Sequence, residues 1–279
     1  MIGVVAHDAG GAEVISSYVR QHQLPCLFCL EGPAQSVFLK KLGPIECLAL
    51  NELVGQSSSI LCGTSFSSNL EWQAISLARN AGKRSMVVLD HWKNYQSRFV
   101  RGGQWHWPDE FWVTDEIAYD LAQQTLPDLP RVLIKNYYLS EMADAIRCAT
   151  RSANRNKSEV RILYVCEPLE QEALVYFLEN IKALPGETST FVLRPHPSEN
   201  VTKYEWVLTK YKANILIDKN KTLIEQVAEC DLVVGCASMA MVVGLLAGKQ
   251  VMSSIPPGSK TNPLPHPGIT RLSDYLLTR

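Results

Sequence analysis

The stretch Asp231-Leu-Val-Val-Gly-Cys-Ala-Ser-Met-Ala-Met-Val-Val-Gly-Leu-Leu-Ala-Gly-Lys-Gln-Val251 predicts a buried strand, a turn of small residues and a helix. The element Arg-Pro-His-Pro at 194–197 comes before it in the chain. A small-residue turn from strand to helix points backbone N–H groups and the Ser238 hydroxyl at an anion near the positive helix end. His196, held between two prolines, is expected to meet the same anion. Together these elements predict a nucleotide-sugar site.

The same alternation of apolar strands and helices runs through the whole chain, which is typical of parallel βαβ units. Strands are predicted at 1–6, 25–30, 59–62, 84–89, 111–114, 132–135, 160–166, 189–194, 213–217, 231–235 and 250–254. Helices are predicted at 11–22, 33–42, 68–82, 115–125, 138–148, 168–184, 199–211, 222–229, 237–247 and 271–278. The fold class is therefore α/β, with two Rossmann-like doubly wound domains facing a cleft at the carboxyl ends of their sheets.

A polar, basic segment separates the two series of strands. It runs Thr150-Arg-Ser-Ala-Asn-Arg-Asn-Lys-Ser158 and contains no large apolar residue. Such a composition is typical of a linker. We therefore predict an N-terminal domain over 1–149, a linker over 150–158 and a C-terminal domain over 159–279.

Composition excludes several classes of protein. With 279 residues, 46% hydrophobic and 20% charged, the chain can form large cores, and its net charge of −1 gives no footprint for nucleic acid. The eight cysteines follow no repeating spacing, which favours a reducing cytoplasm over a secreted disulfide framework. The start lacks a signal-peptide pattern, and glycines and a serine interrupt the apolar stretch 232–248. We expect a cytoplasmic protein with no transmembrane segment.

The His-Pro element at 196–197 and the turn at Ser238 resemble those of bacterial CMP-sugar transferases of the sialyl, Kdo and nonulosonic acid kinds, which are GT-B glycosyltransferases. The resemblance implies that His196 contacts and protonates the donor phosphate and that Ser238 binds it. It also implies a CMP-linked acidic sugar as donor. The turn Ala237-Ser238-Met239 offers one hydroxyl instead of two, and the helix lacks the glutamate of related turns. A UDP-sugar donor therefore stays open.

Two further residues of the second half are assigned to the donor site. Arg194 begins the Arg-Pro-His-Pro element, and Glu167 follows the first strand of this half. A carboxylate there can accept hydrogen bonds from ribose hydroxyls, although a solvated loop glutamate explains it equally well. Likewise, Pro-His-Pro can serve only as a rigid strand exit, and Ser238 can simply cap its helix.

Polar residues also follow strands of the first half. His7, Asp8 and the pair Gly10 and Gly11 come directly after the first strand, where glycines let a ligand approach the backbone. Ser65 precedes a predicted helix. Asp90 and His91 follow the most apolar strand of this half. In parallel strands these groups converge on one rim, so His7, Gly10, Gly11, Ser65 and His91 are assigned to an acceptor.

Sugar transfer with inversion needs a base that takes the acceptor proton. We prefer Asp8, beside the glycine-rich turn, with Asp90 in reserve and His91 third; His196 completes the catalytic set. No Asp-x-Asp, HExxH or paired CxxC motif occurs, so we expect neither a metal nor a cofactor besides the donor. The first loop is not GxGxxG, although Glu31 keeps a nicotinamide enzyme open as an alternative.

These observations predict a metal-independent, inverting glycosyltransferase acting on a surface-glycan or lipid-linked glycan acceptor. A lipid-linked acceptor would bring the protein to the inner face of the membrane. The alternatives are a UDP-sugar transferase, a nucleotide-sugar epimerase or hydrolase, and a non-catalytic protein that binds sugar nucleotides or glycans. In that last case His196 and Ser238 bind a ligand, but Asp8 and Asp90 have no chemical role.

Overall fold

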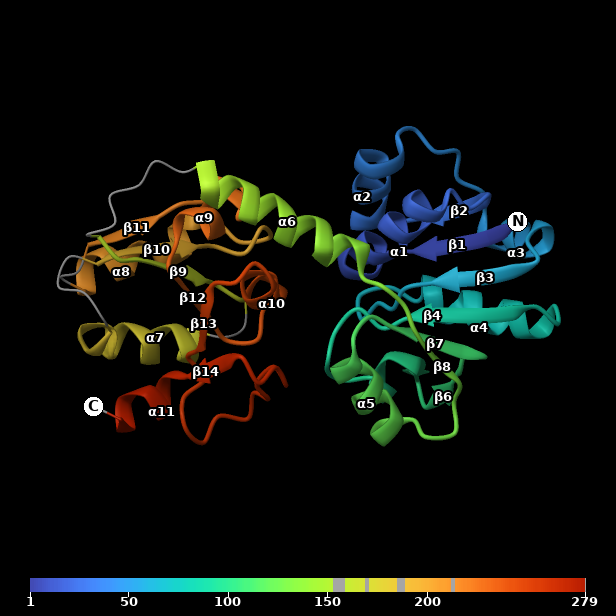
Figure 1. Ribbon diagram of the computed structural model, residues 1–279. Helices are drawn as coiled ribbons and strands as arrows, with labels where there is room; N and C mark the ends of the chain where they lie inside the picture. Colours follow the sequence, from blue (N-terminus) through green and yellow to red (C-terminus); the bar gives the residue numbers. More distant parts are fainter. Residues whose placement is uncertain (153–158, 169–170, 185–188, 212–213, 279) are drawn as a thin grey trace. The chain divides into compact units, whose positions relative to one another are not determined.

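The computed structural model describes residues 1–152, 159–168, 171–184, 189–211 and 214–278 (Figure 1). The chain divides into two compact units, Met1–Tyr138, here called unit 1, and Leu139–Arg279, called unit 2. Each unit contains a parallel sheet with helices on both faces. The α/β fold class with two Rossmann-like domains is therefore confirmed.

Unit 1 is built on a sheet of six parallel strands among its described residues, in the order β2-β1-β3-β4-β7-β8. The strands are β1 (Ile2–Ala6), β2 (Cys26–Leu30), β3 (Ser59–Cys62), β4 (Arg84–Val88), β7 (Glu110–Val113) and β8 (Arg131–Leu133). The chain leaves β1 toward β2 and then returns past β1 to β3. The topological switch point, where ligands bind in open α/β sheets, lies between β1 and β3.

The helices of unit 1 lie on the two faces of this sheet (Figure 1). Helices α1 (Ala9–His22) and α2 (Pro33–Leu42) bury one face, and α3 (Leu50–Gln56) and α4 (Leu70–Asn80) bury the other. Helix α5 (Glu116–Thr125) connects β7 to β8. Helix α3 and the hairpin β5 (Val100–Arg101) and β6 (Gln104–Trp105) were not predicted, because elements this short carry little periodicity.

Unit 2 contains a second parallel sheet, six-stranded among the described residues, in the order β11-β10-β9-β12-β13-β14. Its strands are β9 (Arg161–Val165), β10 (Thr190–Arg194), β11 (Ile215–Ile217), β12 (Leu232–Gly235), β13 (Gln250–Ser253) and β14 (Ile269–Arg271). In order of sequence this is 3-2-1-4-5-6, the arrangement of dinucleotide-binding folds, with the switch point between β9 and β12.

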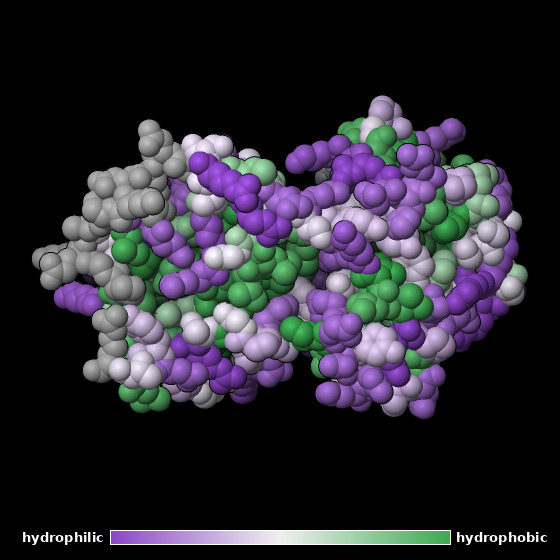
Figure 2. Space-filling model, viewed as in Figure 1, coloured by the Kyte–Doolittle hydropathy of each residue, from purple (hydrophilic) through white to green (hydrophobic). Residues whose placement is uncertain are grey.

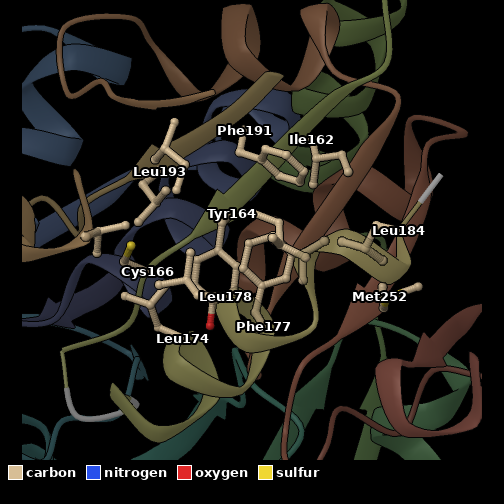
Figure 3. Close-up of a cluster of buried hydrophobic side chains, with 14 of the residues drawn as sticks. Ile162, Tyr164, Cys166, Leu174, Phe177, Leu178, Leu184, Phe191, Leu193 and Met252 are labelled. Atoms are coloured by element: carbon tan, nitrogen blue, oxygen red, sulfur yellow. The ribbon is translucent and has the colours of Figure 1, made fainter. Parts of the chain in front are cut away.

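The helices of unit 2 cover both faces of its sheet. These are α6 (Tyr137–Ser152), α7 (Gln171–Glu179), α8 (Glu205–Lys210), α9 (Leu223–Glu229), α10 (Met239–Leu246) and α11 (Leu272–Leu277). Short 3-10 helices of this unit are η2 (Ile181–Ala183) and η3 (Val201–Tyr204), and η1 (Gln96–Phe99) is a 3-10 helix of unit 1. On one face Tyr164 of β9 packs against Phe177 of α7, with ring centroids 4.8 Å apart (Figure 3). This cluster anchors β9, whose carboxyl end carries Glu167.

The predicted domain boundary is wrong in position. Helix α6 continues through 150–152, which were assigned to the linker, and the compact units divide at Tyr138 and Leu139. The helix persists because Leu139, Ala143 and Ile146 are buried on one face, while hydrophilic residues line the face seen in Figure 2. The remainder of that linker, 153–158, lies outside the described residues, as do 169–170 of the helix predicted at 168–184 and residue 279.

Candidate functional site

His7 and Asp8 lie at the switch point of unit 1, directly after β1. Asp8 is the N-cap residue of α1, but its side chain makes no capping hydrogen bond. Instead Asp8 Oδ1 accepts a hydrogen bond from His7 Nδ1 at 2.7 Å. The side chains of His7 and Asp8 are 20% and 35% exposed, so both can be reached from solvent. The carboxylate therefore orients a histidine ring and does not serve as a helix cap.

The loop after β3 completes this network. Ser65 Oγ and Ser67 Oγ donate to Asp8 Oδ1 at 2.8 and 3.1 Å. The same Ser65 Oγ accepts the backbone N–H groups of Ser67 and Ser68, which fixes the loop in a tight turn. Ser65 was predicted at this rim. Ser67 was not among the predicted site residues, although it lies in the run of hydroxyl residues before α4.

Glu71, in the first turn of α4, bridges the two central strands. Its Oε1 accepts the backbone N–H of His7 at 2.7 Å, while its Oε2 is buried without a hydrogen-bond partner in the described structure. The residue is 2% exposed, and burial raises its pKa, although two backbone hydrogen bonds oppose the rise. The sequence gives Glu71 no role, because the proximity of the first turn of α4 to the end of β1 is a tertiary property.

Asp90 forms a separate ion pair in the same unit. Arg98 Nη1 donates to Asp90 Oδ1 at 3.2 Å and also to the Thr64 hydroxyl, and the Asp90 and Arg98 side chains are 13% and 10% exposed. Burial raises the pKa of Asp90, while Arg98 opposes the rise. Arg98 is therefore largely buried, because its guanidinium pairs with a buried carboxylate.

The two glycines of the first loop contact protein groups. A Cβ at Gly10 would overlap Asp90 Oδ2, and a Cβ at Gly11 would lie 3.0 Å from the Gly63 Cα. The close approach that these glycines permit is therefore internal packing, and a role in binding an acceptor stays a prediction. His91 bonds elsewhere: its Nδ1 accepts the backbone N–H of Trp92 at 2.9 Å.

At the switch point of unit 2, Glu167 takes the position predicted for a ligand anion. Its Oε1 accepts the backbone N–H groups of Cys236 and Ala237 at 3.2 and 2.7 Å. These are N–H groups of the small-residue turn after β12. The predicted turn is present, but part of its N–H surface binds a carboxylate of the chain itself.

Ser238 is the N-cap of α10, and its Oγ accepts the backbone N–H of Ala240 at 3.2 Å. The hydroxyl hydrogen is left to donate, and the helix N-terminus favours an acceptor that carries negative charge. The capping role and the phosphate-binding role are thus compatible. A pocket beside Glu167 is lined by Tyr164, Cys166, Gln171, Leu174, Lys203, Tyr204 and Trp206.

His196 is held by the loop that follows β10. Its Nδ1 accepts the backbone N–H of Ser198 at 3.2 Å and lies 2.7 Å from the Ser198 hydroxyl. Because a backbone N–H can only donate, the proton of the neutral ring is on Nε2. Partial burial lowers the pKa of His196, although Glu199 opposes this. The ring is therefore mainly neutral near pH 7 and presents an Nε2–H donor.

Arg194 is tied into its own unit. Its Nη1 donates to Lys221 O at 2.8 Å and to Gln226 Oε1 at 2.7 Å. Burial lowers its pKa, although Asp218 opposes the shift. These bonds join β10 to the start of α9 and favour a positioning role for Arg194 near the site. Direct contact with a donor stays a prediction.

Within the described ranges, no group of three or more His, Cys, Asp or Glu side chains is arranged to hold a metal ion. Among the same residues, no helix has both the length and the apolar character that crossing a membrane requires.

No protein-family model matches the sequence, and no curated protein sequence matches it. Solved structures match the fold. UDP-GlcNAc 2-epimerase from Methanocaldococcus jannaschii is 10% identical, with a TM-score of 0.61 over 90% of this chain and 83% of that one. Anabaena Alr3699/HepE in complex with UDP-glucose is 14% identical, with a TM-score of 0.57 over 91% and 80%.

MurG of Acinetobacter baumannii is 12% identical, with a TM-score of 0.53 over 93% of this chain and 79% of that one. At these identities the likeness establishes the fold alone. The chain consists of two Rossmann-like domains of the kind found in GT-B enzymes.

Proposed function

We propose that this protein is a glycosyltransferase that takes a sugar from a nucleotide-sugar donor. One observation supports the proposal: in each unit a histidine follows a strand of the sheet, and a hydrogen bond at its Nδ1 orients the ring. In a neutral His7 ring the bond from Nδ1 to Asp8 would leave Nε2 unprotonated, whereas the Ser198 N–H bonded to Nδ1 of His196 would leave the proton of that ring on Nε2. Transfer needs a base for the acceptor and a hydrogen-bond donor for the departing phosphate.

In this proposal unit 2 binds the donor. The Ser238 hydroxyl, the N-terminus of α10 and His196 Nε2–H would hold the donor phosphate. Glu167 would orient the turn from inside, through its bonds to Cys236 and Ala237. Arg194 would hold the His196 loop through α9.

For the donor we propose a UDP-sugar first. Anabaena Alr3699/HepE was solved with UDP-glucose, and a UDP-GlcNAc 2-epimerase from Neisseria meningitidis, 12% identical with a TM-score of 0.55 over 90% of this chain and 81% of that one, was solved with UDP-GlcNAc. A CMP-linked acidic sugar is the second donor class. It is favoured by Glu167, whose charge beside the turn opposes a diphosphate more than a single phosphate.

Unit 1 would bind the acceptor, which we propose to be a glycan or a lipid-linked glycan. His7, Asp8 and Ser65 would form the polar floor of that site, and the chemistry would need no metal ion. A cytoplasmic location, at the inner face of the membrane for a lipid-linked acceptor, belongs to the same proposal.

A nucleotide-sugar 2-epimerase is the second candidate function. It is supported by the epimerase of Methanocaldococcus jannaschii, whose TM-score of 0.61 exceeds that of MurG at 0.53. An epimerase would convert UDP-GlcNAc with no acceptor present. Product analysis by NMR without any added glycan separates the two functions.

The test is a thermal-shift panel with UDP, CMP, GDP, ADP and NAD, followed by turnover of the matching sugar nucleotide. A ligand at one hundred times its dissociation constant stabilises the folded state by about 2.7 kcal/mol. We expect UDP to raise the melting temperature selectively. In Ser238→Ala the affinity for UDP should fall at least tenfold. Ser36→Ala, in α2 of unit 1, is the matched control and should leave the shift unchanged.

A selective CMP shift would keep the function and change the donor. A shift with NAD alone, or no shift with any nucleotide, would overturn the proposal. Binding of UDP without turnover of UDP-GlcNAc or UDP-glucose, in the presence or absence of glycans, would favour the non-catalytic binding protein.

A further inference from the structure

We infer that His7, and not Asp8, is the general base of unit 1, and that Asp8 is its positioning residue. This inference deepens the proposed function and rests on it. It reverses the sequence-based preference for Asp8 as base.

The polar atoms of His7 carry the inference, because three of the four are fixed by hydrogen bonds. The backbone N–H donates to Glu71 Oε1 at 2.7 Å, and the backbone oxygen accepts the N–H of Ala34 at 2.9 Å. Nδ1 donates to Asp8 Oδ1 at 2.7 Å. Nε2 makes no hydrogen bond within the described part of the chain, and in the neutral ring with Nδ1 protonated it carries the lone pair.

The position of the ring is also fixed by packing. A Cβ added at Gly32, which precedes α2, would lie 2.6 Å from His7 Nε2 and 2.9 Å from Cε1. The ring therefore lies directly against the Gly32 backbone on one side. The side chain as a whole is 20% exposed, so part of the ring is open to solvent.

Asp8 is less suited to take the proton. Its Oδ1 already accepts three hydrogen bonds, from His7, Ser65 and Ser67. Donors around a carboxylate stabilise its charged form and occupy its lone pairs. The same arrangement suits a carboxylate that holds a neighbouring imidazole in one tautomer and stabilises the imidazolium that forms. Asp90 is paired with Arg98 and covers Gly10, so it is not available either.

In the proposed step, His7 accepts the proton of the acceptor hydroxyl. The acceptor hydroxyl oxygen forms a bond to the anomeric carbon of the donor while its proton moves to Nε2 of His7. The bond from the anomeric carbon to the phosphate oxygen breaks, and its electron pair stays on the nucleotide. The products are the glycoside, the free nucleotide and a protonated His7 that returns its proton to solvent.

The first test needs no substrate. Imidazole ¹⁵N spectra of the full chain, with the His7 signal identified by its loss in His7→Gln, report the proton position on the ring. At neutral pH we expect an unprotonated Nε2 and a protonated Nδ1, and a mixture of tautomers in Asp8→Ala. A His7 ring with its proton on Nε2 in the wild type would overturn the inference even if the protein proves to be a transferase.

The second test uses the donor that the nucleotide panel identifies. His7→Gln should lower kcat by about 10²–10⁴-fold, the usual contribution of a general base, while the affinity for the free nucleotide stays unchanged. Asp8→Ala should lower kcat by less, because the imidazole remains. His22→Gln is the matched control: this ring packs on Tyr18 and Tyr137, away from the network, and the variant should turn over as the wild type does.

The outcomes separate the two proposals. Turnover in the wild type that survives in His7→Gln refutes His7 as the base and leaves the transferase in place. No nucleotide binding at all refutes the proposed function, while the ¹⁵N spectra still decide whether Asp8 fixes the tautomer.

Discussion

The switch points of the two units use the same device in different surroundings. In each, a glutamate carboxylate accepts backbone N–H groups from the other central strand end: Glu71 from His7 at 2.7 Å in unit 1, and Glu167 from Ala237 at 2.7 Å in unit 2. Glu71 is 2% exposed, whereas Glu167 is only partly buried. Burial therefore fixes the Glu71 side chain and raises its pKa, whereas Glu167 lies partly exposed next to the turn that is expected to bind a ligand.

His7 and His196 differ in the group that bonds to Nδ1. Asp8 accepts a hydrogen bond from Nδ1 of His7, which in the neutral ring leaves the lone pair on Nε2, whereas the Ser198 N–H donates to Nδ1 of His196 and leaves the proton of the neutral ring on Nε2. One residue type thus supplies an acceptor in unit 1 and a donor in unit 2. The partner of Nδ1, and not the histidine itself, decides which.

Away from the switch points the units are alike. Ala81-Gly82-Lys83 and Ala247-Gly248-Lys249 end α4 and α10 at the same place in each topology. Gly82 and Gly248 have φ of +65° and +83°, and each lysine N–H bonds a carbonyl five residues back, at Ala78 and Gly244. The lysine side chains then donate to carbonyls at the ends of α3 and α9.

The largest effect on the free energy of unfolding is expected at Glu71, the buried glutamate of unit 1. Glu71→Ala leaves the His7 N–H unsatisfied and opens a cavity, which should lower the free energy of unfolding by about 3 kcal/mol. Glu167→Ala, in the partly exposed position, should cost about 1 kcal/mol. Urea denaturation followed by tryptophan fluorescence measures both, and equal losses would break the contrast.

The pH dependence of the free energy of unfolding sharpens the contrast between Glu71 and Glu167. Folding raises the pKa of Glu71, chiefly by burial, so the folded state binds that proton more tightly than the unfolded state does. The free energy of unfolding should therefore fall as pH rises from about 4 through the folded-state pKa. Asp90 contributes with the same sign. Glu71→Gln, which keeps an acceptor oxygen, should flatten the fall; an unchanged slope would exclude Glu71 as its source.

Gly10 in unit 1 and Gly235 in unit 2 face different neighbours. Gly10→Ala must displace the Asp90 carboxylate from its pair with Arg98 and should cost about 2–3 kcal/mol. Gly235→Ala in unit 2 meets apolar atoms, Val165 Cγ2 at 2.7 Å and Met241 Sδ at 3.0 Å, and should cost about 1–2 kcal/mol. Thermal unfolding of the two variants checks that Gly10→Ala loses more stability than Gly235→Ala does. Gly55→Ala, in open space within α3, is the control and should be neutral or stabilising.

The smallest difference is expected between the two lysines. Lys83 Nζ donates at 2.5–2.7 Å to Val54, Gly55 and Ser57 oxygens, and Lys249 Nζ at 2.9–3.0 Å to those of Ala228 and Cys230. Lys83→Met should cost about 2 kcal/mol and Lys249→Met about 1 kcal/mol. Hydrogen exchange should show faster opening of α3 in the first variant and of α9 in the second. The reverse assignment would refute the equivalence of the two motifs.

Much of the fold was predictable because its signals are local. Apolar runs of four to six residues followed by amphipathic helices place β1 to β4 and β9 to β13 correctly. Part of the candidate site could be predicted for the same reason, because polar residues directly after strands pointed to His7, Asp8, Ser65, Glu167 and Ser238; their roles in binding and catalysis stay predictions. Short elements such as α3 and β14 carry too few residues for a periodic signal and were missed.

The sequence by itself determined that the chain forms two parallel α/β units and which loops carry polar groups at strand ends. Only the tertiary structure decided the partners, because contacts such as His7–Glu71, Asp8–Ser65 and Glu167–Ala237 join residues 64, 57 and 70 positions apart. Strand order brings these residues together, and strand order follows from how whole helices pack across the sheet. Burial, and with it the raised pKa of Glu71, follows from that packing as well.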